Sequence, residues 1–285
     1  MEPTSPAGLQ AYDDVVAVAD QLVVGLDFDG VLSPIVEDPT EARIHPDAAA
    51  TLLDLAETVR AVAVVTGRPA RQALALGDLD EVGQAMADRG TELFVFGQYG
   101  NERWSSSQRR IVSPRPPAGL AGFQRDLPAL LRRTGAQDAF VEEKGLAVAV
   151  HTRRMADPHD ALERLTAPLR DLAERHGLVL EPGRNVVEVR GPGMHKGDAV
   201  QTLVEEQSPG AFLYAGDDLG DVVAFEAVAR LREQGMPTLL VAVASDEQAA
   251  LVALADVVVT GPAGVLDLLR TLAGDARARS GTASD

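Results

Sequence analysis

Short runs of consecutive apolar residues, each followed by a turn rich in Gly, Pro or Asp, recur along the first third of this chain. Apolar runs of this length are typical of strands buried on both faces of a parallel sheet. Three such runs are Leu22–Leu26, Val62–Val65 and Leu93–Phe96, and His45–Val59 between the first two has the apolar spacing of a helix. This alternation of strands and helices predicts an α/β domain with a parallel sheet.

The pattern changes in the middle of the chain and returns near residue 190. Two helical segments, Gly122–Arg133 and Ala156–His176, alternate there with two strand pairs, Ala139–Glu142 with Leu146–His151 and Leu178–Leu180 with Val186–Val189, the second turning at residues 182–185. After residue 190 the alternation of helices and strands returns. We expect helices at Lys196–Glu206, Asp221–Glu233 and Ser245–Ala255, and strands at Ala211–Ala215, Thr238–Val243 and Asp256–Thr260. The sequence therefore predicts a core of residues 1–107 and 191–285, an inserted α+β cap of residues 108–190, and a flexible tail from about residue 274.

The composition limits the partners of the chain. It carries 43 acidic and 26 basic side chains, a formal charge of −17, which disfavours binding to nucleic acid or to anionic membranes. The absence of cysteine excludes disulfides, thiol catalysis and the usual structural zinc sites. No apolar stretch approaches the roughly 18 residues of a membrane span, and the N-terminal residues do not resemble a signal peptide. We therefore expect a cytoplasmic protein.

Two carboxylates follow the first apolar run. Because side chains alternate along a strand, Asp27 and Asp29 should project toward the same side as the chain leaves the sheet. The carboxyl end of a parallel sheet is where α/β proteins bind ligands, and two carboxylates this close need a cation or a raised pKa. The alternative interpretation is an acidic turn that closes the strand.

Three more acids, Asp217, Asp218 and Asp221, follow the expected strand Ala211–Ala215. Carboxylates from two strand ends that meet at one sheet edge would repel each other without a metal ion. An all-oxygen set of ligands favours Mg²⁺ over Zn²⁺. The alternative for Asp221 is to cap the helix that begins there.

Two further features could bind an anion. Thr66, Gly67 and Arg68 follow the second apolar run and offer a hydroxyl and backbone N–H groups to a phosphate oxygen. Lys196 begins a helix, where its ammonium could neutralise an anion. Taken singly, these are also consistent with a plain turn and a solvated charge at a helix end.

With these motifs in this order, the chain resembles the haloacid dehalogenase superfamily of phosphohydrolases and, within it, the trehalose-6-phosphate phosphatase family. The similarity runs from about residue 24 to residue 269. Its four motifs are Leu26–Val31, Thr66, Lys196 and Gly216–Asp221, and the cap adds segments 141–144, 151–153 and 188–190. Three positions depart from the family pattern: Val31 replaces a common Thr, and Gln98-Tyr99 replaces a common Asn-His pair. The resemblance implies a Rossmann-like core with an inserted cap.

The resemblance also implies roles for the motif residues. Asp27 would be the nucleophile that forms an aspartyl-phosphate, and Asp29 the general acid and base. The metal would be Mg²⁺, held by Asp27, Asp29 and Asp217, with Asp218 and Asp221 supporting it from outside the ligand set. Thr66 and Lys196 would stabilise the oxygens of the transferred phosphoryl group.

The substrate implied by the resemblance is a phosphorylated disaccharide, trehalose 6-phosphate. Gly67 and Arg68 would contact its phosphate side, and Glu142, Lys144, Arg153 and Glu188 in the cap would bind sugar hydroxyls. Period-two spacing should place Glu142 and Lys144 on one face, although a solvated polar sheet face would look the same. The alternatives are another sugar phosphate (glucosylglycerol, sucrose or mannosylglycerate phosphate) or a non-catalytic sugar-phosphate-binding module. The family also suggests a functional link to a trehalose-phosphate synthase.

Overall fold

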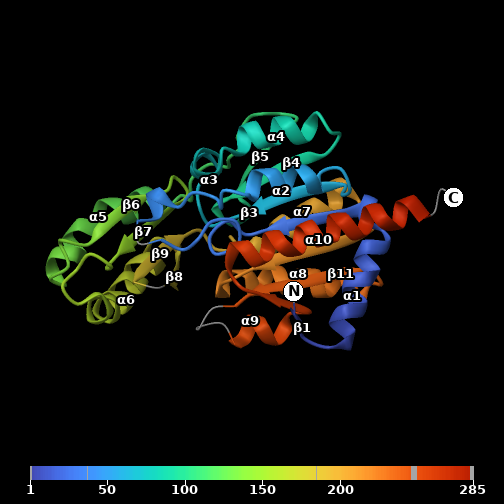
Figure 1. Ribbon diagram of the computed structural model, residues 1–285. Helices are drawn as coiled ribbons and strands as arrows, with labels where there is room; N and C mark the ends of the chain where they lie inside the picture. The colour runs from blue at the N-terminus through green and yellow to red at the C-terminus, as the bar shows by residue number, and fades with distance from the viewer. Residues whose placement is uncertain (1, 37, 184, 245–248, 283–285) are drawn as a thin grey trace. The chain divides into compact units, whose positions relative to one another are not determined.

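The computed structural model describes residues 2–36, 38–183, 185–244 and 249–282 (Figure 1). The chain divides into two compact units: residues 1–113 together with 195–285, called the core unit below, and residues 114–194, called the inserted unit. The predicted boundaries lie a few residues earlier. Residues 108–113 remain with the core unit because Val112 pairs with Arg103 and Ile111 packs against the core cluster.

The core unit contains an eight-stranded sheet in the order β1-β12-β11-β10-β2-β3-β4-β5. Its strands are β1 (Glu2–Pro3), β2 (Leu22–Leu26), β3 (Ala61–Val65), β4 (Glu92–Gly97), β5 (Glu102–Ser105), β10 (Ala211–Gly216), β11 (Thr238–Val243) and β12 (Val257–Val259). The six inner strands run parallel, whereas β1 and β5 at the edges pair antiparallel. The strand order reverses between the neighbouring strands β2 and β10. Doubly wound sheets bind ligands at the carboxyl ends of the two strands where the order reverses.

Helices cover both faces of this sheet (Figure 1). They are α1 (Pro6–Ala17), α2 (Ala48–Leu55), α3 (Ala70–Gly77), α4 (Leu79–Ala87), α7 (Lys196–Gln207), α8 (Val222–Glu233), α9 (Ala249–Leu254) and α10 (Gly261–Thr282). Alternate side chains of each strand enter different clusters: Val24 packs with α1, α2 and α10, and Val23 with α7 and α8. Residues 245–248 of one predicted helix lie outside the described residues.

The predicted flexible tail from about residue 274 is wrong for the part of it that the structure describes. Residues 274–282 complete α10, which packs against α1. Tyr12 donates a hydrogen bond of 2.7 Å to Asp275, and Ala276 is buried. A partner more than 250 residues away in the sequence therefore orders a segment whose local composition indicated fraying.

The inserted unit is a four-stranded antiparallel sheet in the order β6-β7-β9-β8, with two helices on one face. Its elements are α5 (Leu120–Arg133), β6 (Phe140–Glu143), β7 (Ala147–His151), α6 (Pro158–Arg175), β8 (Val179–Gly183) and β9 (Val186–Arg190). Val148, Val150 and Leu169 belong to the core between sheet and helices. The predicted order of helices and hairpins is confirmed, although Arg184 in the second turn lies outside the described residues.

Among the described residues, no helix combines the length and apolar character needed to cross a bilayer.

Candidate active site

The loops that follow β2 and β10 meet at the switch in strand order. Asp27 comes directly after β2 and is buried, and its Oδ1 accepts a hydrogen bond of 2.7 Å from the N–H of Phe28. Gly30 has a φ of 74°, and a Cβ atom there would lie 2.1 Å from Oδ2 of Asp217. Gly30 therefore lets the two loops approach closely enough to bring Asp27 and Asp217 together.

Four carboxylates converge at this point. Oxygen atoms of Asp27, Asp217, Asp218 and Asp221 all lie within 4.8 Å of one another, and Asp218 is the exposed member. Asp29 does not belong to this cluster, because its carboxylate is directed to Arg68. Asp29 is therefore paired with a cation of its own, and the expectation that Asp27 and Asp29 project to the same side stays a prediction.

Lys196 and Asp221 form the buried centre of the site. The Nζ atom of Lys196 lies 2.9 Å from Oδ2 of Asp27 and 2.8 Å from Oδ1 of Asp221. Asp221 is fully buried and accepts further hydrogen bonds from the backbone N–H groups of Asp217 and Asp218. Its side chain therefore holds Lys196 and the loop. It does not cap α8, as the alternative interpretation proposed.

One residue of this network, Tyr214, was not predicted from the sequence. Tyr214 lies in β10, is fully buried, and donates a hydrogen bond of 2.9 Å to Oδ1 of Asp221. Gly25 in β2 provides the space, since a Cβ atom there would lie 2.7 Å from the Tyr214 ring. A glycine inside an otherwise continuous apolar strand was the available signal, because such a glycine marks a close approach by a neighbour.

Burial controls the electrostatics of the cluster. It raises the pKa of Asp217 to about 8, and the carboxylates of Asp218 and Asp221 add to the effect. Burial also raises the pKa of Asp27 well above its usual value, and Lys196 only partly opposes this. For Lys196 itself, burial disfavours the charged form, but the carboxylates of Asp221 and Asp27 outweigh it and raise the pKa. Lys196 is therefore a cation within an excess of negative charge.

The loop after β3 presents the predicted phosphate-binding groups. Thr66 is buried, and its Oγ1 accepts a hydrogen bond of 3.1 Å from the N–H of Arg68. The N–H groups of Gln98 and Tyr99 donate to the carbonyls of Arg68 and Thr66, at 2.8 and 3.0 Å. Gln98 and Tyr99 both have positive φ angles, of 50° and 60°, a costly conformation for non-glycine residues that is typical of functional sites.

Tyr99 also explains the glycine at position 67. A Cβ atom on Gly67 would lie 2.8 Å from Cζ of the Tyr99 ring, so a larger residue at position 67 would displace this ring. Gln98 and Tyr99, which depart from the family pattern, therefore support the loop of residues 66–68 through their backbone and a ring. Their role in this loop was not predicted.

Three of the four cap residues expected to bind sugar lie together on one face of the inserted sheet. Glu142 and Glu188 are both in register with Ala149, so their side chains project to the same side. Nζ of Lys144 lies 2.7 Å from Oε2 of Glu188, which places its ammonium on this face as well. Arg153 is exposed and lies beyond the end of β7.

Glu188 has one oxygen available for a ligand. The residue is buried, with 6% of its surface exposed, and its Oε1 atom has no hydrogen-bond partner among the described residues. A buried carboxylate oxygen without a donor is costly, so a ligand hydroxyl at this position would be stabilised.

Comparison with known proteins identifies the chain. The sequence model of the trehalose-phosphatase family matches residues 25–257. The chain belongs to this family. A trehalose-phosphate phosphatase of Mycobacterium tuberculosis is 31% identical over 218 residues, which cover 74% of this chain and 52% of the relative. An uncharacterized glycosyl hydrolase of the same species is 35% identical over 238 residues, 79% of this chain but 17% of that protein.

The fold agrees with this assignment. The C-terminal domain of a C. albicans trehalose-6-phosphate phosphatase superposes with a TM-score of 0.74 at 19% identity, covering 96% of this chain and 98% of that domain. The predicted α/β core with a parallel sheet is confirmed. Our chain nevertheless spans only about half the length of the M. tuberculosis phosphatase that it matches.

The donor set of this trehalose-phosphatase family member fits a hard divalent cation. The cluster offers carboxylate oxygens alone, its three buried members are Asp27, Asp217 and Asp221, and burial raises the pKa of each of these three. Of these residues, Asp27 and Asp217 are the pair that would hold Mg²⁺, because both oxygens of Asp221 are already occupied, Oδ1 by Lys196 and Tyr214 and Oδ2 by two backbone N–H groups.

The pKa of Asp217 predicts a pH-dependent response to Mg²⁺. Because this pKa is about 8 in the folded protein and near 4 in an unfolded chain, the folded state keeps a proton that the unfolded chain loses. Its contribution to stability is present in acid and is lost as the pH rises through about 8. Mg²⁺ replaces that proton, so we expect it to raise the melting temperature by several degrees at about pH 8 and much less at about pH 5.

Thermal unfolding with Mg²⁺ and with EDTA at both pH values measures this difference. Asp217→Asn should remove the pH-dependent part of the response, whereas Asp20→Asn, a change at an exposed acid before β2, should leave it intact. An equal response at both pH values would contradict the prediction.

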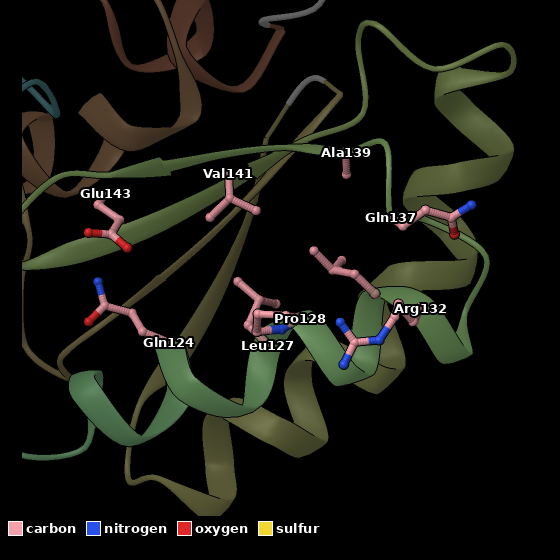
Figure 2. A pocket seen from close by; sticks show the side chains of 9 residues that line it. Gln124, Leu127, Pro128, Arg132, Gln137, Ala139, Val141 and Glu143 are labelled. Carbon is pink, nitrogen blue, oxygen red and sulfur yellow. The ribbon is translucent and has the colours of Figure 1, made fainter.

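A groove of about 500 Å³ in the inserted unit is not part of this site (Figure 2). Leu127 and Leu131 of α5 form its apolar side, and Val141 and Glu143 of β6 line the opposite side. These β6 residues project to the face opposite that of Glu142, and no predicted site residue lines the groove. It therefore does not account for sugar binding.

Proposed function

We propose that this chain is a Mg²⁺-dependent phosphatase that hydrolyses trehalose 6-phosphate to trehalose and phosphate. The observation that carries the proposal is the buried carboxylate of Asp27 in contact with Lys196, at the carboxyl ends of the central strands. Family membership supplies the reaction class and suggests the substrate. The same proposal places the reaction in the cytoplasm and links it to a trehalose-phosphate synthase that supplies the substrate.

In the first step an oxygen of Asp27 attacks phosphorus, forming an O–P bond as the bond from phosphorus to the sugar oxygen breaks. Asp29 gives a proton to that leaving oxygen. Lys196, the Thr66 hydroxyl and the N–H of Gly67 stabilise the negative charge on the other phosphoryl oxygens. Mg²⁺, when bound, would neutralise the carboxylates and the phosphate so that the two anions can meet.

In the second step the aspartyl-phosphate is hydrolysed. Asp29, now a carboxylate, accepts a proton from water as the water oxygen bonds to phosphorus and the bond to Asp27 breaks. Free phosphate leaves and both carboxylates return to their starting state. Two displacements at phosphorus, the first by Asp27 and the second by water, divide a very slow hydrolysis into two easier steps.

The inserted unit would select the sugar. Glu188 offers its buried Oε1 to a hydroxyl, and Lys144 and Glu142 lie on the same face with groups that donate or accept. Charged groups make strong directional hydrogen bonds to hydroxyls. Arg153 would complete the set from the end of β7.

Phosphate release tests the proposed substrate. Trehalose 6-phosphate should be hydrolysed rapidly with Mg²⁺ and not with EDTA, and should be preferred over glucose 6-phosphate, sucrose 6-phosphate and glucosylglycerol phosphate. Preference for another sugar would keep the chemistry and overturn the substrate. No hydrolysis of any of them would favour a binding module without catalysis.

A matched pair of variants tests the sugar-binding face. Glu188→Gln should raise the KM for trehalose 6-phosphate by about 10-fold or more, because a charge-assisted hydrogen bond is lost, and should leave hydrolysis of p-nitrophenyl phosphate nearly unchanged. Glu143→Gln is the control, since Glu143 is exposed and projects to the opposite face of the sheet from Glu142. Equal effects of both changes on the two substrates would argue against a sugar contact.

A further inference from the structure

Arg68 is held at every polar atom of its side chain. Its Nε and Nη2 atoms donate to the two oxygens of Asp29, each at 2.7 Å, and Nη1 donates to the carbonyl of Pro39 at 2.6 Å. The guanidinium also lies over the Phe28 ring, 5.5 Å from its centroid, and the residue is 9% exposed. A bidentate pair of this kind fixes the plane and the direction of a carboxylate.

The backbone of Arg68 is fixed as well. Its N–H donates to Oγ1 of Thr66, and its carbonyl accepts from the N–H of Gln98 at 2.8 Å. The strained backbone at Gln98 therefore supports the same residue whose side chain holds Asp29. Arg68 is thus anchored to the phosphate-binding loop at one end and to the loop after β2 at the other.

This anchoring separates Asp29 from the other acids. Asp29 is two residues from Asp27, and its side chain is 37% exposed, yet it stays outside the cluster of four carboxylates. A free aspartate at such a turn has several rotamers available, whereas one bound to a fixed guanidinium has a single direction. Proton transfer to a leaving oxygen depends on such a direction, because the acid must lie within hydrogen-bond reach of it.

We propose that Arg68 is a positioning residue that holds Asp29 in place for proton transfer, in contrast to the substrate-binding role expected from the sequence. This inference rests on the proposed function, since it assigns the partner of the general acid and base. The bidentate contact requires a guanidinium. The Arg68→Lys variant should therefore be more active than the Arg68→Gln variant but less active than the wild type.

A double-mutant cycle with two substrates tests the proposal. Arg68→Gln and Asp29→Asn should each lower kcat on trehalose 6-phosphate by about 100-fold or more, because a positioned acid or base contributes at least this much. The double variant should be no slower than Asp29→Asn alone, since both changes remove the same proton transfer. The first-turnover release of p-nitrophenolate from p-nitrophenyl phosphate should change far less, because this leaving group does not need a proton. Arg71→Gln, a change at an exposed arginine of α3, is the control.

Two results would overturn the proposal. One is a raised KM with unchanged kcat in Arg68→Gln. The other is a decrease in the kcat of the double variant equal to the product of the decreases in the two single variants. Either result would indicate that Arg68 contacts the substrate. If wild-type protein hydrolyses neither substrate, the proposed function fails separately. Urea unfolding of the wild type, Arg68→Gln, Asp29→Asn and the double variant then measures whether Arg68 and Asp29 are coupled. Additive changes in the free energy of unfolding would show that the two side chains do not interact.

Discussion

Asp27→Asn is expected to lower phosphate release from trehalose 6-phosphate by about four orders of magnitude or more, as removal of an enzymatic nucleophile does. The amide has the size of the carboxylate but cannot form an acyl phosphate. Its effect on folding should be small, because the buried carboxylate already carries a raised pKa and Lys196 retains Asp221 as a partner.

Three measurements together establish the result. Phosphate release gives the loss of turnover, circular dichroism shows that the variant is folded, and calorimetric titration with trehalose 6-phosphate shows whether binding survives. Asp20→Asn, a change at an exposed acid before β2, is the matched control and should behave as wild type. Turnover retained in Asp27→Asn would place the nucleophile elsewhere.

Lys196→Met should have the largest effect on stability. Lys196 is 3% exposed and lies between Asp27 and Asp221, so the change leaves two buried carboxylates without their cation. Removing one partner of a buried ion pair costs about 3–5 kcal/mol. Turnover should be lost as well, because in the proposed mechanism this ammonium stabilises the phosphoryl oxygens.

A second change separates the two consequences of Lys196→Met. Because the pKa of Lys196 is raised, its ammonium contributes to stability at every pH below the ordinary lysine value, and the contribution is lost only at higher pH. Adding Asp221→Asn to Lys196→Met removes one uncompensated charge, so part of the unfolding free energy should return while turnover should not. Urea unfolding at about pH 8 measures this, and an unchanged stability of Lys196→Met would contradict the buried-cation account.

The strands and motifs of the core were predictable from local pattern alone. Leu22–Leu26 and Thr238–Val243 are strands with the predicted bounds, because a continuous apolar run between turns has few other structures open to it. The acids of two such strands were expected to meet, and Asp27 and Asp217 do, since parallel strands end at a common edge.

The direction of each carboxylate was not predictable in this way. Period-two spacing grouped Asp27 with Asp29, but Asp27 contacts Lys196 whereas Asp29 contacts Arg68, a cation from a different loop. Tyr214 was passed over as an ordinary strand residue, because its contact with Asp221 depends on the space left by Gly25 on the neighbouring strand.

The sequence by itself thus determined the parallel sheet, the order of the four motifs and the family. The tertiary structure alone decided which cation serves which carboxylate: Lys196 lies against Asp27 and Asp221, while Arg68 holds Asp29. Local pattern reflects the burial of neighbouring residues, whereas an ion pair depends on distances between segments far apart in the chain. Those distances exist only once the sheet and its loops are assembled.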